Sequence, residues 1–410
     1  MIYLILSLLF LCLGLLREKG LFLFLALLSC LPFSNSFSLY FYQFGLYAYD
    51  YFFFGLLISA CVKGIATKAP KLKIHRWATL SFLIIVTYSA VSIFSDIPLD
   101  VYFLRDYRPA IFSLELIAAS SLLRSKKIHL STNNILTIVT LAGTTNLTWL
   151  ALSIVGVISS DDTYYTTNNF KYFDASTYIS ALFIMHFFSR TKTPGHAERK
   201  LAINPRQAMA ITASLLSVIL SGYRILAVAS IIAAALASAR SPKKFIQILI
   251  VFAISAVVFI FLSDHFGAER VADSLTTDGL LQQLSTRYGP ALDVIFSFAP
   301  SNYLFGHGFG TVFDITWFEY RSLDTKNNFV DSTYLTFFAK YGFLGLVYIT
   351  LITIALVSLT PRSIKTPLLA YLLILFVTFA ITYQSASVGL IVGCMLIRML
   401  QSNSDGTAKT

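Results

Sequence analysis

Apolar stretches of about 17–25 residues recur along this chain, and that is the length a helix needs to cross the hydrocarbon core of a bilayer. The 410 residues are 56% hydrophobic and only 12% charged, with a mean hydropathy of +0.73. Soluble domains of this length do not bury so large an apolar share. An outer-membrane barrel would show alternating segments of about 10 residues instead. The sequence therefore predicts an all-α polytopic membrane protein.

The apolar pattern predicts about 12–13 transmembrane helices. We expect them near residues 2–16, 21–33, 46–62, 77–95, 109–123, 134–158, 174–189, 207–221, 224–239, 245–263, 331–358, 367–382 and 384–400. Residues 207–239 are nearly uninterrupted, but a single helix there would be about 50 Å long, too long for a core of about 30 Å. A hairpin that turns at residues 221–224, where Gly222 suits the turn, avoids this excess.

Lysine and arginine are concentrated in one set of loops, which indicates the cytoplasmic side. These loops include residues 17–19, 63–76, 124–127, 190–206, 240–244 and 362–365. The same bias accounts for the net charge of +11, so no nucleic-acid partner is predicted. The alternate loops, including the longest one, then face the outside. In a Gram-negative cell this places the chain in the inner membrane with its long loop in the periplasm.

Four regions follow from this pattern. Residues 1–263 form transmembrane helices with short loops, and residues 264–330 form one large periplasmic loop. Residues 331–400 form the C-terminal transmembrane helices, and residues 401–410 form a polar cytoplasmic tail. The four cysteines lie inside apolar segments without metal-ligand spacing, and no HExxH motif occurs, so neither a metal nor another cofactor is predicted.

Arginines gather near the predicted outer face, at Arg108, Arg224, Arg270 and Arg287. The planar guanidinium binds phosphate through two parallel hydrogen bonds and keeps its charge at all relevant pH values. These residues are therefore candidates to bind a lipid-linked phosphate or pyrophosphate. The alternative for each is a side chain that reaches the interface, or an ion pair with a nearby aspartate. Arg224 stands in a very apolar hairpin, where an isolated charge is costly.

Two residues of the same face are candidate general bases. His307 lies in the run Gly306-His307-Gly308-Phe309-Gly310, and its ordinary pKa near 6.5 suits a base at neutral pH. The alternative is a glycine turn in which the histidine is only a polar tip. Asp331 opens the next predicted helix, where a carboxylate complements the positive helix end. The alternative there is a plain N-terminal acid, with Ser332 sharing the capping.

Three segments resemble motifs of the O-antigen polymerase and ligase superfamily. Residues 220–224 (LSGYR) are similar to its "SGSR" before a small-residue helix. Ser285-Thr286-Arg287, followed by residues 304–310 (LFGHGFG), is similar to its "SR…GxGxG". Residues 331–345, from Asp331-Ser332 to Gly342-Phe343-Leu344-Gly345, are similar to the ligase pattern H-(N/S/Q)-x9-G-x-x-G. Tyr223 and Tyr334 lie inside these motifs and are candidates to bind sugar or pyrophosphate.

The resemblance implies a GT-C-like membrane glycosyltransferase without cofactors. Its substrate would be an undecaprenyl pyrophosphate-linked oligosaccharide, and its partners would include membrane lipids and a chain-length regulator protein. Asp331 stands where the ligases carry histidine, which favours a repeat-unit polymerase over a ligase. The polymerase is expected to join repeat units at the periplasmic face. The alternatives are an O-antigen ligase that transfers polymer to lipid A-core, and a flippase or transporter of lipid-linked oligosaccharides.

Overall fold

The computed structural model of the protein describes residues 1–33, 38–43, 45–67, 75–93, 100–124, 130–155, 173–189, 204–221, 223–239, 241, 245–248, 250, 253, 277–315 and 325–407. It is mostly helical (81%), as predicted. Two short antiparallel ribbons accompany the helices: β1 (Tyr42–Gln43) pairs with β2 (Leu46–Tyr47), and β3 (Phe313–Asp314) pairs with β4 (Lys326–Asn327).

The helices of the first half mostly follow the apolar runs. They are α1 (Ile2–Leu15), α2 (Glu18–Cys30), α3 (Ser38–Phe41), α4 (Asp50–Thr67), α5 (Arg76–Ile93), α6 (Val101–Arg105), α7 (Arg108–Leu123), α8 (Thr132–Ile154), α9 (Ala175–Ser189), α10 (Pro205–Leu220) and α11 (Arg224–Ser238). The predicted hairpin is confirmed, because α10 ends and α11 begins on either side of residues 221–223. Proline in the first turn of α7 and of α10 fits the start of a helix, where one N–H has no partner.

The second half contains α15 (Thr277–Phe296), α16 (Asn302–Phe305), α17 (Thr333–Leu359), α18 (Lys365–Thr378) and α19 (Val388–Thr407), with 3₁₀ turns at Arg362–Ile364, Ile381–Tyr383 and Ser385–Ser387. Most of the predicted span at 245–263 falls outside the described residues. The stretch predicted as a polar loop contains a 20-residue helix, α15. Ser332, and not Asp331, is the N-cap of α17, because its side chain accepts a hydrogen bond from the Leu335 backbone N–H.

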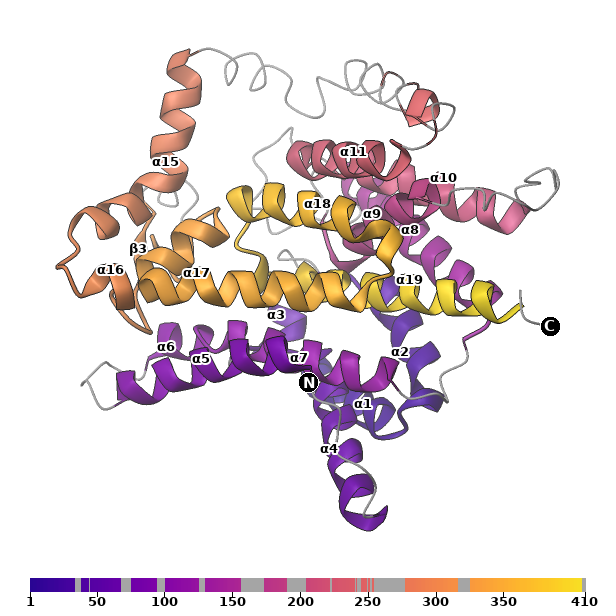
Figure 1. Cartoon of the computed structure of the whole chain (residues 1–410), viewed down its shortest axis with the longest axis horizontal. Helices are drawn as coiled ribbons and strands as arrows, with labels where there is room; N and C mark the ends of the chain where they lie inside the picture. The colour runs from indigo at the N-terminus through magenta and orange to yellow at the C-terminus, as the bar shows by residue number, and fades with distance from the viewer. Residues whose placement is uncertain are drawn as a thin grey trace.

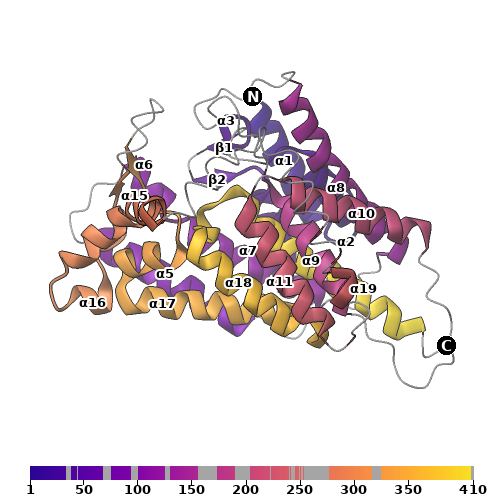
Figure 2. The same cartoon turned by 90° about the horizontal axis from the view of Figure 1, so that it is seen from above.

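Helix α19 lies at the centre of the assembly, packed against α7, α8, α9 and α17. Figure 1 shows α17 and α19 crossing the middle of the molecule, with α5 and α7 on one side and α18 on the other. Seen from above in Figure 2, α15 and α16 lie at the end of the molecule away from the C-terminus. The core is therefore built from helices of both halves of the chain.

Among the described residues, four helical stretches are long and apolar enough to cross a membrane: Arg76–Ile93, Thr132–Leu152, Thr333–Leu359 and Ser385–Asn403. Shorter apolar helices occur at Ile2–Leu15, Ala175–Ser189, Pro205–Leu220 and Ile225–Ser238. The C-terminal stretch is 83% buried inside the protein, whereas the α5 stretch is only 28% buried. This pattern supports a multi-pass membrane protein with α19 inside the bundle and α5 at its edge.

Several polar contacts join helix ends that the charge bias assigns to the same side of the membrane. At the side predicted to be cytoplasmic, the His75 imidazole lies 2.5 Å from the Ser358 hydroxyl, and the Asn403 amide donates to the Leu130 carbonyl at 2.8 Å. At the other side, the Tyr49 hydroxyl donates to the Ser385 carbonyl at 2.7 Å. Each of these contacts joins ends that the charge pattern assigns to the same side.

Close helix contacts depend on small residues, as is usual where membrane helices meet. A β-carbon on Gly389 of α19 would overlap the backbone carbonyl of Ala175 in α9. In contrast, a β-carbon on Gly289 of α15 would meet no atom within 4 Å. The two glycines therefore form a matched pair for substitution.

We predict that Gly389→Ala lowers the free energy of unfolding by about 1–3 kcal/mol, because α19 and α9 must separate to admit the methyl group. Gly289→Ala should change it by less than about 1 kcal/mol, because better helix propensity and the restriction before Pro290 oppose each other. Denaturant titration of both variants in detergent checks this. Equal effects would contradict the assigned α9–α19 contact.

Candidate functional site

Arg287 and Asp331 are brought together, as two halves of a candidate anion-binding and base site. The Arg287 Nη1 lies 3.6 Å from the Asp331 Oδ2. Both side chains remain about half exposed, at 47% and 41%. Arg287 comes from the middle of α15, and Asp331 lies two residues before α17 begins. The two residues are far apart in the sequence but close in space because α15 packs against α17.

The C-terminal end of α18 lies beside this pair. The Tyr288 hydroxyl donates to the Val377 carbonyl at 3.0 Å, which fastens α15 to α18. Burial raises the pKa of Tyr288 above its ordinary value, so the hydroxyl stays a neutral donor. The Tyr334 ring meets the Phe376 ring edge to face, with the centroids 5.8 Å apart.

The start of α11 reaches the same end of α18. The Tyr223 ring lies 5.9 Å from the Phe379 ring and 4.9 Å from the Phe173 ring. We call this aromatic group the α18 rim: Tyr223, Tyr288, Tyr334, Phe376 and Phe379. The three segments with motif resemblance therefore each contact the C-terminal end of α18. Figure 1 shows α18 between α11 and α17.

Two predicted arginines at this face lie partly or wholly outside the described residues. The backbone of Arg224 begins α11 next to Tyr223, but its side chain lies outside the described part of the chain. Arg270 lies wholly outside the described residues. Their assignment as phosphate ligands stays a prediction.

His307 occupies a separate position at the far end of α15. Its backbone N–H donates to the Ala339 carbonyl at 3.0 Å, and the Gly308 N–H donates to the Lys340 carbonyl at 2.8 Å. The exposed imidazole Nε2 lies 3.1 Å from the Ser297 hydroxyl. Ser297 follows Arg287 by ten residues, or about 15 Å along a helix. His307 and Asp331 therefore do not form one catalytic pair in this structure.

The glycines around His307 have a clear structural purpose. Gly306 has a φ of +68° and Gly342, inside α17, has a φ of +56°. A β-carbon on either would overlap the backbone of the other segment. The Gly306-His307-Gly308 turn thus fits against an interruption of α17, which supports the turn interpretation of this motif while leaving His307 accessible.

Arg108 is not an exposed phosphate ligand in this structure. Its guanidinium donates to Asp50 at 2.5 Å, to the Tyr49 hydroxyl at 3.0 Å and to Glu115 at 3.2 Å, and the side chain is only 2% exposed. The Tyr47 ring covers it at 4.7 Å. Arg108 is therefore paired with an aspartate, which was the alternative interpretation from the sequence. The partner, Asp50, comes from α4 and not from a neighbouring loop.

A second buried network was missed from the sequence. The Asp106 carboxylate accepts bonds from the Lys340 ammonium at 2.5 Å, the Gly310 N–H at 2.6 Å, the Asn328 amide at 3.0 Å and the Tyr383 hydroxyl at 3.2 Å. Lys340 and Asp106 are fully buried. This network joins the α6–α7 connection to α17 and to the segments beside His307 and Asp331. A lysine inside an apolar span was the available signal, because such a charge requires a partner.

Residues 20–410 match the model of DUF6369, a family of unknown function. The chain belongs to this family. Among curated proteins and solved structures, none matches it. The DUF6369 match includes both buried networks, the Arg287–Asp331 pair and the α18 rim. The family assignment therefore covers the whole candidate site without assigning it an activity.

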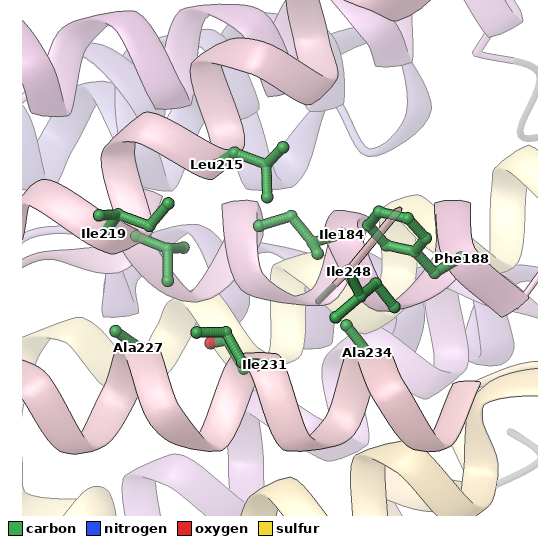
Figure 3. A pocket seen from close by; sticks show the side chains of 10 residues that line it. Ile184, Phe188, Leu215, Ile219, Ala227, Ile231, Ala234 and Ile248 are labelled. Carbon is green, nitrogen blue, oxygen red and sulfur yellow. The ribbon is translucent and has the colours of Figure 1, made fainter. Parts of the chain in front are cut away.

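An apolar cavity of the DUF6369 chain lies away from this site. Figure 3 shows it between α9, α10 and α11, lined by Ile184, Phe188, Leu215, Ile219 and Ile231, among others. Ser230 is its one polar lining side chain among the described residues. In the described part of the chain, no group of three His, Cys, Asp or Glu residues is placed to hold a metal ion. The Arg287–Asp331 pair beside the α18 rim remains the stronger candidate for chemistry.

Proposed function

We propose that this protein is a repeat-unit polymerase: a membrane glycosyltransferase that joins undecaprenyl pyrophosphate-linked oligosaccharides. The observation that carries the proposal is the half-exposed Arg287–Asp331 pair beside the α18 rim. It combines a permanent cation, a carboxylate and aromatic rings at one end of apolar helices. A lipid-linked pyrophosphate sugar presents matching chemistry, namely an anion at the membrane surface next to a sugar.

In the proposed reaction, the bond between the anomeric carbon of the donor sugar and its pyrophosphate oxygen breaks. A hydroxyl of the acceptor unit forms the new glycosidic bond and gives its proton to Asp331, the candidate base beside Arg287. The lipid pyrophosphate leaves with its negative charge, which Arg287 and Arg224 stabilise. Atoms and charge balance without a metal, a nucleotide or another cofactor.

The geometry of the pair suits exchange between protein and substrate. Tight charge-assisted hydrogen bonds from arginine measure about 2.7–2.9 Å. The Arg287–Asp331 separation of 3.6 Å is longer, and both groups face solvent. A pyrophosphate can therefore take the guanidinium, and the exposed Asp331 carboxylate then accepts the proton of the acceptor hydroxyl. In this proposal the Tyr223 and Tyr334 rings contact sugars of the two substrates.

The proposed topology has about 12–13 spans in a bacterial inner membrane with a GT-C-like arrangement, and the site faces the periplasm. The paired helix ends support alternating spans, since Tyr49, Ser385 and the Arg287–Asp331 pair belong to ends with few basic residues. The motif resemblance to O-antigen polymerases, and no other observation, suggests a chain-length regulator as the protein partner.

A flippase or transporter is the second candidate, and the buried charges favour it. Transporters place ionisable residues inside the membrane near their substrates. The Arg108–Asp50–Glu115 and Lys340–Asp106 networks are buried among the helices. Lys340 and Asp106 neutralise each other, however, and the Asp106 carboxylate accepts four hydrogen bonds. In the other network one guanidinium holds two carboxylates, and the side chains of both networks are closed to solvent. We therefore assign both networks to structure and keep polymerase as the primary proposal.

We predict that deleting the gene in its bacterium reduces the surface lipopolysaccharide to core carrying one repeat unit. The ladder on a gel after silver staining measures this. Bare core together with lipid-linked polymer would indicate a ligase instead. Accumulation of single lipid-linked units on the cytoplasmic face would indicate a flippase, and an unchanged ladder would contradict all three.

A further inference from the structure

The predicted polar loop contains an uncharged segment. Residues 294–313 include no Asp, Glu, Lys or Arg, although they lie between Asp293 and Asp314. Several large apolar side chains in this segment are exposed: Phe296 at 79%, Tyr303 at 53%, Phe305 at 51% and Leu304 at 46%. We call residues 296–305, which connect α15 to α16 and include α16, the elbow. Such a patch on a water-facing loop needs a covering partner.

The elbow lies alongside two helices that can cross a membrane. The backbone of Gly306 packs against Lys340 and Tyr341, and Gly342 packs against Leu304. Gly342 follows the start of α17 at Thr333 by nine residues, or about 13 Å along the helix. The elbow therefore lies well inside the length of α17 and not beyond its end. Phe343 of α17 and Val91 of α5, exposed at 56% and 59%, extend the same kind of apolar surface.

Backbone carbonyls where the elbow meets α17 have the hydrogen-bond donor that a lipid environment requires. The glycine conformation interrupts α17 at Gly342, and interruptions expose carbonyl groups that water cannot reach inside a bilayer. The Tyr88 hydroxyl of α5 lies 3.1 Å from the Phe305 carbonyl and 3.2 Å from the Tyr341 carbonyl. The single phenol hydrogen is shared between the two carbonyls beside the two close-packed glycines. Ser297, at the start of the elbow, has its hydroxyl 3.1 Å from the His307 imidazole.

We propose that the elbow is a re-entrant segment whose apolar side chains insert among the lipid acyl chains of the outer leaflet. Its occupant is the bilayer itself, because the exposed side chains continue the apolar surfaces of α5 and α17 and carry no charge. This inference does not depend on the enzymatic proposal. It places Ser297 and His307 at the boundary between lipid and water.

Site-directed spin labelling in lipid nanodiscs tests the proposal with the full chain. The four native cysteines are replaced by alanine, and a nitroxide is attached to cysteine at Tyr303 or Phe305. Gln282, exposed on the polar part of α15, is the control for water, and Phe343 of α17 is the reference for lipid. At Tyr303 and Phe305 we expect collisions with oxygen to exceed those with a water-soluble nickel chelate by several-fold. At Gln282 we expect the reverse.

Three outcomes would overturn the inference. Nickel accessibility at Tyr303 and Phe305 equal to that at Gln282 would mean that the elbow faces water. Low accessibility to both reagents would mean that protein, such as a second copy of the chain, covers it. Water-like values at Phe343 as well would mean that this part of α17 is not in the membrane. The measurement needs no enzymatic activity, so it is independent of whether the polymerase proposal holds.

Discussion

Replacing Arg287 by alanine should shorten the surface polysaccharide to single repeat units while the protein remains in the membrane. The guanidinium is the described cation that faces solvent beside Asp331, and loss of one charged group that stabilises a developing anion costs about 100-fold or more in rate. Its ion pair is half exposed, so its removal should cost at most about 1 kcal/mol of stability. The lipopolysaccharide ladder of a complemented deletion strain, with membrane immunoblots, measures both effects.

A charge-swapped variant distinguishes a role of the pair in substrate binding from a purely structural ion pair. In Arg287→Asp combined with Asp331→Arg, the ion pair can reform, but the cation and the base exchange places. If the pair is only structural, this double variant restores the ladder. We expect no restoration, because pyrophosphate and acceptor would each meet the wrong group. Normal ladders in Arg287→Ala and Arg224→Ala together would refute the assignment.

Replacing Lys340 by methionine should destabilise the protein strongly, by about 3–5 kcal/mol, because it leaves the Asp106 carboxylate buried without its cation. Asp106→Asn should have a comparable effect, since the Lys340 ammonium then lacks its counter-charge. Both groups are fully buried, unlike the Arg287–Asp331 pair. Unfolding in a denaturant titration in mild detergent measures the change.

The neutral double variant supplies the control for this network. Asp106→Asn with Lys340→Met removes both charges and should be less destabilised than the sum of the single variants, because no unpaired charge remains. The amide of asparagine can still accept the Gly310 N–H bond. Single variants that each lose less than about 1 kcal/mol would show that the pair is not a structural anchor.

Local sequence features predicted the helices because they act over short distances. Apolar runs located α7, α9 and α17, and the need to fit a bilayer correctly divided residues 207–239 into α10 and α11. The sequence prediction was less accurate for the predicted periplasmic loop, residues 264–330, which contains α15. Its polar composition predicted a loop, whereas the structure has a helix that packs against α17. Composition alone does not show which neighbouring helix will stabilise such a segment by packing.

By itself, the sequence determined the helical class, the alternation of basic and acidic ends, and the presence of arginine and aspartate candidates, because each follows from local hydropathy and charge. Only the tertiary structure decided which candidates meet. It joined Arg287 to Asp331, buried Arg108 with Asp50, and paired Lys340 with Asp106 across 234 positions of the chain. Such pairings depend on how whole helices pack, since a buried charge is stable only beside a partner that packing brings to it.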